Sequence, residues 1–163
     1  MDDPDIRPPT LVALPSYLAG NVARIGHRLL LEALAEHDLR LAHFAVLAAL
    51  SDFGPLAQHE LAERLDLNPS HLVGYVDEIE QRDLVRRDRD PGDRRRQHVA
   101  LTAPGRALLE RLHEVAQRSQ AEFLQVLSER ERKRLIALLR RVLQADDEAR
   151  LKDKATGHAR NAG

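Results

Sequence analysis

The segment spanning residues 84–101, LVRRDRDPGDRRRQHVAL, carries a dense set of side chains that suit binding to a polyanion. Six arginines and three aspartates lie between Arg86 and Arg96, a local surplus of three positive charges in a chain whose formal total is −1. Two β-prone stretches flank a turn at Pro91 and Gly92, so the segment is predicted to form an exposed hairpin. Guanidinium groups pair well with phosphates, which favours a nucleic acid as the partner. The alternative is a solvated charged loop.

The composition excludes several classes of protein. The chain has no cysteine, which rules out disulfides, thiolate metal sites, iron–sulfur clusters and thiol redox sensing. Aromatic residues make up 3% with no Trp, which counts against proteins that stack single-stranded bases. No apolar run reaches membrane-spanning length and the acidic, Pro-rich N-terminus is unlike a signal peptide, so a cytoplasmic protein without a membrane partner is expected.

Hydrophobic periodicity predicts six helices around the hairpin. They cover about residues 11–36, 41–52, 58–65, 69–82 and 103–126, with a last helix opened by the S-x-x-E capping box at 128–131. The strands of the hairpin are predicted at 84–87 and 97–101. Thr102 is expected to cap the helix that follows the hairpin, and Asn68 the helix that starts with Pro69.

The predicted helix at 69–82 has one face free for a ligand. Its apolar residues Leu72, Val76 and Ile79 follow i, i+4, i+7 spacing and are expected to be buried. In a helix-turn-helix, the N-terminal residues of the second helix contact base edges in the major groove. The candidate DNA-contact residues of this helix start are Asn68, Pro69, Ser70, His71, Val73 and Gly74.

Two residues of this helix allow two interpretations each. Gly74 costs helix stability relative to Ala, and either clears space for DNA or is a tolerated weak position. Asp77 either accepts a hydrogen bond from a cytosine amino group or pairs with a nearby arginine.

The order of these elements resembles the MarR family of winged helix-turn-helix regulators from about residue 11 to 147. The resemblance is most specific in DPGDRRRQHVALTAPGRALL, residues 90–109, and continues through residues 56–87. It implies that Arg95 enters a minor groove and that Asp93 orients it. The arginines implied as phosphate contacts are Arg86, Arg87, Arg94 and Arg96.

The chain departs from the family pattern at two helix ends. Ala57 stands where similar sequences often have a Ser or Thr cap, which predicts a loosely started helix. Asp83 stands where a helix-ending Gly is usual, and Asp tolerates the left-handed conformation less well.

The expected fold is mainly α with a small β wing (α+β), in a single domain at residues 11–147. The winged helix-turn-helix covers about 41–101, flanked by dimerisation helices at about 11–36 and 103–147. Residues 1–10 are expected to form a flexible arm and residues 148–163 a frayed tail. The resemblance implies an intertwined homodimer, which the long amphipathic terminal segments also favour. The alternative is a monomer whose terminal helices cap the core.

The resemblance also implies a small aromatic or phenolic effector between the dimerisation helices and the DNA-binding part. The candidate lining residues are Tyr17, Arg24, His27, His43, Phe44 and His113. For each of them the alternative is ordinary packing. A zinc site is the other reading of the eight histidines, but no H-x-x-x-H or H-E-x-x-H spacing occurs, so no metal or cofactor is expected.

The sequence therefore predicts a homodimeric regulator of transcription, acting as a repressor on a pseudo-palindromic double-stranded operator and released by its effector. The alternative function is a winged-helix protein–protein adaptor without DNA affinity. An enzyme is not expected, because the chain has no Gly-rich phosphate loop, metal motif or nucleophile elbow.

Overall fold

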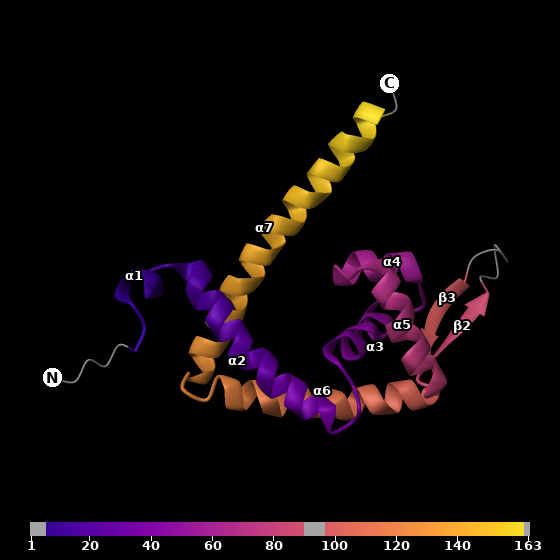
Figure 1. Ribbon diagram of the computed structural model, residues 1–163, viewed down its shortest axis with the longest axis horizontal. Coiled ribbons are helices and arrows are strands. Elements are labelled where there is room, and N and C mark those ends of the chain that lie inside the picture. The colour runs from indigo at the N-terminus through magenta and orange to yellow at the C-terminus, as the bar shows by residue number, and fades with distance from the viewer. Residues whose placement is uncertain (1–5, 90–96, 162–163) are drawn as a thin grey trace. The chain divides into compact units, whose positions relative to one another are not determined.

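The fold, a computed structural model, is mainly α with a small β-sheet, as the sequence predicted (Figure 1). The structure describes the backbone of residues 6–89 and 97–161, and side chains as far as residue 152. The chain divides into two compact units, Met1–Phe123 and Leu124–Gly163. The first unit contains α1 (Pro9–Val12), α2 (Pro15–Ala35), α3 (Leu41–Phe53), β1 (Leu56–Ala57), α4 (Gln58–Leu65), α5 (Pro69–Gln81), β2 (Val85–Arg89), β3 (Gln97–Leu101) and α6 (Ala103–Phe123). The second contains α7 (Glu129–Asn161).

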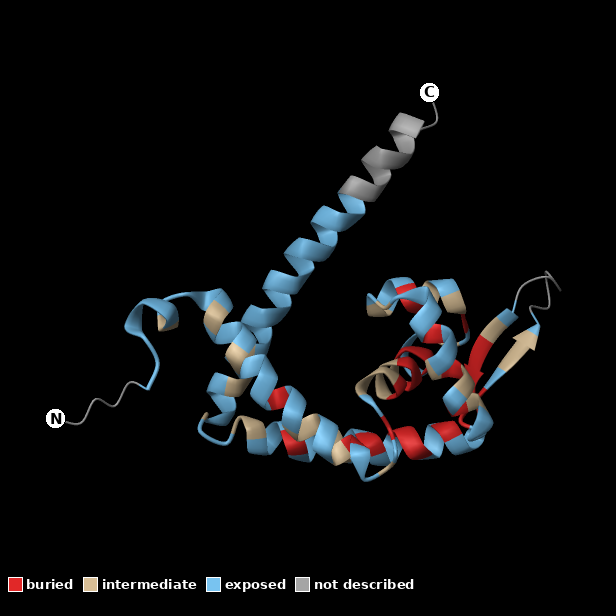
Figure 2. Ribbon diagram, in the orientation of Figure 1, coloured by how far each residue is buried: buried red, intermediate tan, exposed pale blue. Residues whose placement is uncertain are grey.

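The hydrophobic core of the first unit joins α3, α4 and α5 to the sheet and to one side of α6 (Figure 2). Leu72, Val76 and Ile79 of α5 are fully buried, so the predicted inward face of this helix is confirmed. Burial of each such side chain contributes on the order of 2 kcal/mol to folding. The core therefore fixes which face of α5 remains available to a ligand.

The sheet is antiparallel with the strand order β1–β3–β2. In the hairpin, Val85 pairs with Leu101 and Arg87 with Val99, which gives β2 and β3 a continuous register over all five residues of each strand. The sequence did not predict β1. This strand has two residues, too few to show alternation, and it exists because Leu56 pairs with Val99.

Two predicted helix caps are confirmed, at the starts of α5 and α6. The Ser70 backbone N–H donates to Asn68 Oδ1 over 2.9 Å at the start of α5. The Gly105 N–H donates to Thr102 Oγ1 over 3.0 Å at the start of α6. These bonds satisfy backbone donors that have no partner inside the helix, and they fix where each helix begins.

The helix ends differ from the predictions in three places. The first predicted helix is broken before Pro15, because Leu14 takes an extended conformation (φ −94°, ψ 115°) that the following proline favours. Helix α6 ends at Phe123, three residues before the predicted end. Helix α7 extends to Asn161, past Gly157, where a frayed tail was expected.

Helices α2 and α6 pack closely along their length. A Cβ added to Gly26 of α2 would lie 3.0 Å from the ring of Phe123 in α6, so a small residue permits this approach. Within the described chain, none of these helices has the length and apolar character needed to cross a bilayer.

Candidate nucleic-acid interface

The N-terminal turn of α5 presents an exposed polar face. Asn68, Pro69, Ser70 and His71 are all exposed, and Val73 retains 45% of its surface. The core residues of α5 lie on the other side of the helix, so Ser70 and Gly74 face outward, as predicted. His71 and Val73, expected on the flanks of this face, are exposed as well. A helix start of this kind offers backbone N–H groups and a positive dipole end to an anion.

Gly74 lies on the same exposed side of α5. A Cβ added there would meet nothing within 4 Å. The fold therefore does not require glycine at this position, and the interpretation that Gly74 clears space for DNA stays a prediction.

The hairpin arginines are described only in part. Arg86 and Arg89 of β2 are exposed, and Arg86 Nε donates to Asp88 Oδ2 on the same strand over 2.7 Å. Four predicted contact residues of the wing lie outside the described residues, and their roles stay predictions. They are Asp93, Arg94, Arg95 and Arg96.

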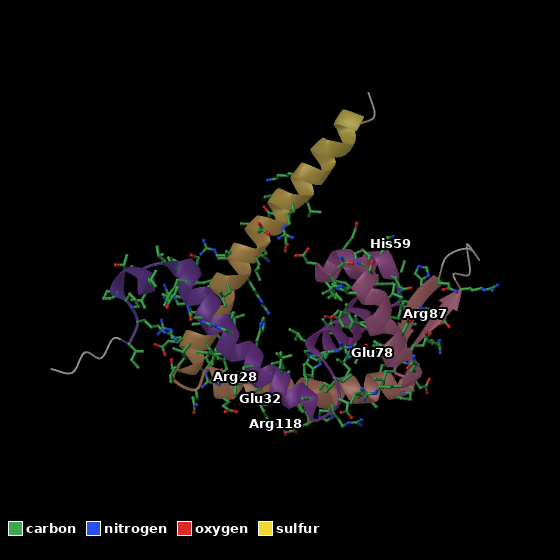
Figure 3. All side chains as sticks on the ribbon, in the orientation of Figure 1. Arg28, Glu32, His59, Glu78, Arg87 and Arg118 are labelled. Carbon is green, nitrogen blue, oxygen red and sulfur yellow. The ribbon has the colours of Figure 1, made fainter. Side chains whose placement is uncertain are left out.

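Arg87 has a different environment from its neighbours on β2. Figure 3 labels Arg87 on this strand. Its side chain is 19% exposed, and one terminal nitrogen lies 2.5 Å from Asp77 Oδ1 while the other pairs with Glu80. The Arg87 backbone N–H also donates to Glu80 Oε1 over 3.0 Å. Of the two interpretations of Asp77, the structure supports pairing with an arginine. Arg87 was predicted to contact phosphate, but its guanidinium pairs with Asp77 and Glu80 of the same chain.

A second polar network joins α3 to α5 around the buried His43. The imidazole Nδ1 accepts a hydrogen bond from the Arg40 backbone N–H over 3.1 Å, and Nε2 lies 3.0 Å from Glu78 Oε2. The His43 ring meets Tyr75 edge-on with centroids 5.5 Å apart. Arg40 pairs with Glu78 and lies 5.0 Å from the Tyr75 ring centre.

Burial and charge explain how this network ionises. Burial lowers the pKa of His43, because a charged imidazole loses solvation there. The hydrogen bond from Arg40 lowers the pKa of Glu78, and the same bond raises the pKa of Arg40. Since Nδ1 accepts a bond, the proton of a neutral His43 lies on Nε2, facing the Glu78 carboxylate. The network therefore holds α5 against the start of α3.

Sequence reasoning missed both polar networks, although it named several of their members. Two partners of His43, Tyr75 and Glu78, lie more than thirty positions away in the chain. The side-chain partners of Arg87 lie on another element. The acidic run of α5 was the available signal, since Asp77, Glu78 and Glu80 face two different basic partners.

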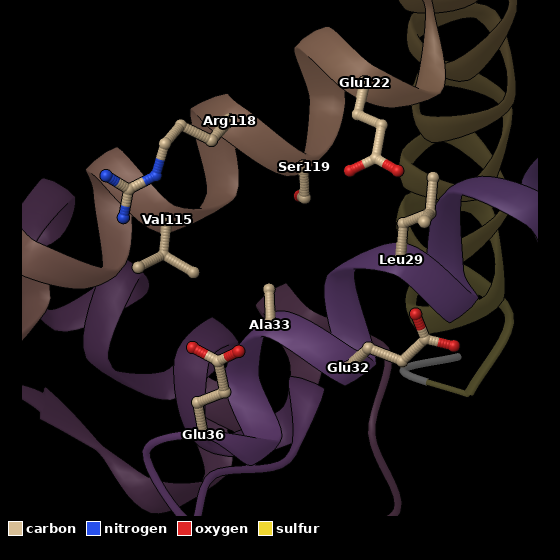
Figure 4. Close-up of a pocket in the computed structure, with 8 residues that line it drawn as sticks. All are labelled: Leu29, Glu32, Ala33, Glu36, Val115, Arg118, Ser119 and Glu122. Atoms are coloured by element: carbon tan, nitrogen blue, oxygen red, sulfur yellow. The ribbon is translucent and has the colours of Figure 1, made fainter.

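A pocket of about 320 Å³ lies between α2 and α6 (Figure 4). Its lining differs from the predicted effector residues and consists of Leu29, Glu32, Ala33, Glu36, Val115, Arg118, Ser119 and Glu122. Three carboxylates and one guanidinium therefore line this space.

The structure does not gather the six predicted effector residues into one site. Phe44 and His113 meet edge-on with ring centroids 6.3 Å apart. His43 instead packs against α5. On α2, Arg24 pairs with the side chain of Asn21, and the Tyr17 carbonyl accepts a bond from the same amide, while His27 is exposed. In the part of the chain with described side chains, no three His, Asp or Glu residues are grouped as metal ligands.

The chain is similar to known regulators of transcription. Residues 39–96 match the model of the MarR family. The HTH-type transcriptional repressor NicR of Pseudomonas putida is 34% identical over 69% of this chain and 71% of its own length. A putative transcriptional regulatory protein for the hcr operon of Thauera aromatica is 34% identical over 64% of this chain. The chain spans 63% of the length of that protein, which is less than two thirds.

A solved structure gives the same fold with DNA present. The crystal structure of a mutant MarR from E. coli complexed with operator DNA has a TM-score of 0.71 and 28% identity, covering 84% of this chain and 99% of that one. The exposed start of α5 and the adjacent arginine-bearing hairpin are thus set in a winged helix-turn-helix fold. The chain belongs to the MarR family of transcriptional regulators, which is not a family of enzymes.

Proposed function

We propose that the chain is a homodimeric repressor that binds a pseudo-palindromic operator in double-stranded DNA. The observation that carries this proposal is the exposed N-terminal face of α5 on the same unit as the arginine hairpin. Two further findings support it: a similar chain has been solved with operator DNA, and the similar Pseudomonas putida protein is named a repressor.

Each DNA-reading element has its own task in this mechanism. Ser70 and His71 offer hydrogen bonds to base edges in the major groove, and Val73 offers an apolar contact to a thymine methyl. Arg95, oriented by Asp93, enters the adjacent minor groove. The exposed guanidinium of Arg86 neutralises a phosphate, which holds the protein in register without reading sequence.

Two apolar helix faces support the homodimer. On α2, Leu18, Val22 and Ile25 are each 40% exposed and follow the spacing of one helix face. On α7, Val142 is 71% exposed and Leu143 65% exposed. Apolar stripes of this length are stabilised when a second copy covers them. A two-fold dimer presents two α5 helices to half-sites about one helical turn apart.

We assign effector release to the pocket between α2 and α6, whose volume of about 320 Å³ suits a small molecule. Its carboxylates, Glu32, Glu36 and Glu122, favour a phenol over an aromatic acid, since like charges repel. The effector acts by binding one separation of the two α5 helices better than the other, which lowers affinity for the operator.

A titration of the Arg95→Ala variant on a duplex from the chain's own promoter region tests the proposal. We expect a loss of about 1–3 kcal/mol in operator affinity, with the dimer unchanged in sedimentation. Arg111→Ala, which alters an exposed arginine on α6 outside the interface, is the matched control and should bind like the parent. A parent chain with no affinity for duplex DNA would support the adaptor function instead.

A further inference from the structure

We propose that Arg87 is a positioning residue that fixes α5 to the wing strand β2 and thereby sets the spacing between the two DNA-reading elements. The inference rests on the proposed function, because it assigns a role within DNA recognition. It departs from the sequence-based expectation that Arg87 contacts phosphate.

Three polar contacts make the connection between the helix and the strand. The two terminal nitrogens of Arg87 engage Asp77 and Glu80, which lie three residues apart on α5 and therefore on one helix face. Glu80 also accepts the Arg87 backbone N–H over 3.0 Å. One carboxylate thus holds both the side chain and the main chain of the strand, which restricts sliding as well as separation.

Arg86, on the same strand, makes no described contact with another element and is far more exposed than Arg87. Consecutive strand residues point to opposite faces, and the Arg86 side chain is 64% exposed against 19% for Arg87. The partner of Arg86, Asp88, belongs to its own strand, so that pair joins no two elements. Arg86 is therefore the matched comparison for a phosphate-contact role.

The charges around Arg87 argue against a phosphate ligand. One guanidinium and two carboxylates give the cluster a formal charge of −1. A phosphate approaching Arg87 would displace carboxylates that already satisfy its donors and would meet their repulsion.

The position of the cluster explains what it controls. From Asp77 the helix runs back about two turns to Ser70 and His71 at its exposed start. From Arg87 the strand runs forward to Arg89, its last residue. Because both elements are regular, fixing them at this point fixes the distance between the base-reading helix start and the hairpin.

The decisive experiment is the double variant Asp77→Asn, Glu80→Gln, measured on a footprinted duplex from the chain's own promoter region and on a scrambled duplex of equal length. The positioning role predicts that the ratio of the two affinities falls about 10-fold or more, because the charge-assisted bonds are lost. A phosphate-contact role predicts the opposite: Arg87 is released, both affinities rise together and the ratio stays constant.

Arg87→Lys provides a second test that preserves the charge. Lysine cannot span two carboxylates with a planar fork, so the positioning role predicts the same loss of discrimination with the slope of log K against log salt unchanged. Arg86→Ala should instead reduce that slope by about 0.9 at constant discrimination. Circular dichroism and sedimentation confirm that each variant is folded and dimeric.

The outcomes separate this inference from the proposed function. If the parent chain binds neither duplex, the proposed function fails and the role of Arg87 fails with it. If the parent discriminates between the duplexes and both Arg87→Lys and the double variant discriminate equally well, the positioning role alone is overturned.

Discussion

Among single residues, Gly105 shows why the helix that follows the hairpin begins with a glycine in its first turn. A Cβ added to Gly105 would lie 1.9 Å from the carbonyl oxygen of Leu84, which already accepts the Thr102 N–H over 3.2 Å. The start of α6 thus rests directly on the turn between α5 and β2. Only a residue without a side chain permits this approach, and the backbone on the other side cannot move without disturbing the hairpin.

Gly105→Ala is expected to lower the free energy of unfolding by about 1–3 kcal/mol or more, because the added methyl group overlaps backbone atoms. Gly74→Ala is the matched control, since its methyl group meets nothing within 4 Å and alanine is favoured in a helix by about 1 kcal/mol. Urea unfolding measures both. Equal effects of the two substitutions would contradict the close approach seen at Gly105.

His43 makes stability depend on pH. Burial lowers its pKa in the folded chain, so an unfolded chain takes up a proton at a pH where the folded chain does not. This contribution is complete above about pH 6.5 and diminishes as the pH falls below that value. The lowered pKa values of Glu78 and Glu131 act at lower pH, since carboxylates are ordinarily ionised above about pH 5.

We therefore expect the free energy of unfolding to decline between about pH 6.5 and 5, and to decline less in His43→Asn. Asparagine keeps an acceptor oxygen near the position of Nδ1 for the Arg40 N–H but does not titrate. Denaturant unfolding across this range measures the difference. Identical pH profiles for the two proteins would show that His43 is not the responsible group.

At the scale of helices and strands, the elements predicted best are those whose ends are encoded locally. Helix α4 and strand β3 have the predicted bounds, and the caps at Asn68 and Thr102 form as expected. The left-handed conformation at Asp83 (φ 55°) is also present, where glycine had been the usual residue. Each of these features depends on a few consecutive residues.

The features that sequence reasoning missed depend on residues far apart in the chain. Strand β1 exists through its pairing with β3, and the contacts of Arg87 need α5 and β2 to be packed together. The exposed face of α5 was predictable from helical periodicity. The partners of the charged side chains were not predictable, because periodicity shows which face of a helix a residue occupies but not which residue it contacts.

The start of α4 offers a stabilising substitution. Ala57 has the extended conformation of an N-cap (φ −68°, ψ 152°), and its N–H already donates to Glu60 Oε2 over 2.8 Å. Ala57→Ser supplies the missing acceptor and should raise the free energy of unfolding by roughly 1 kcal/mol. Ser128→Ala, which removes the corresponding acceptor from α7, should lower stability by a similar amount. Thermal unfolding distinguishes the two, and a destabilised Ala57→Ser variant would contradict the cap geometry.

For the whole molecule, the main open question is what covers the exposed apolar residues outside the core. Exposed apolar residues occur on α2 and on α7, which belong to different units, and the proposed dimer depends on a second copy covering them. The proposed dimer would also provide the two copies of α5 that a pseudo-palindromic operator requires.

Val142→Glu places a charge on the exposed apolar side of α7, where the native side chain is 71% exposed and takes no part in the described core. The variant should fold but dissociate at concentrations where the parent is a dimer, and its operator affinity should fall because half-sites are bound singly. Ser51→Glu, at an exposed position of α3 outside the expected dimerisation helices, is the control. Sedimentation velocity gives the answer, and a fully dimeric Val142→Glu protein would contradict the proposed interface.

Footprinting of the parent chain on its own promoter region, at several salt concentrations, shows whether paired α5 helices bind duplex DNA. We expect two protected half-sites about one helical turn apart, with protection that weakens steeply as salt rises because several phosphates are neutralised. Protection of one isolated site, protection insensitive to salt, or no protection of duplex DNA would contradict it.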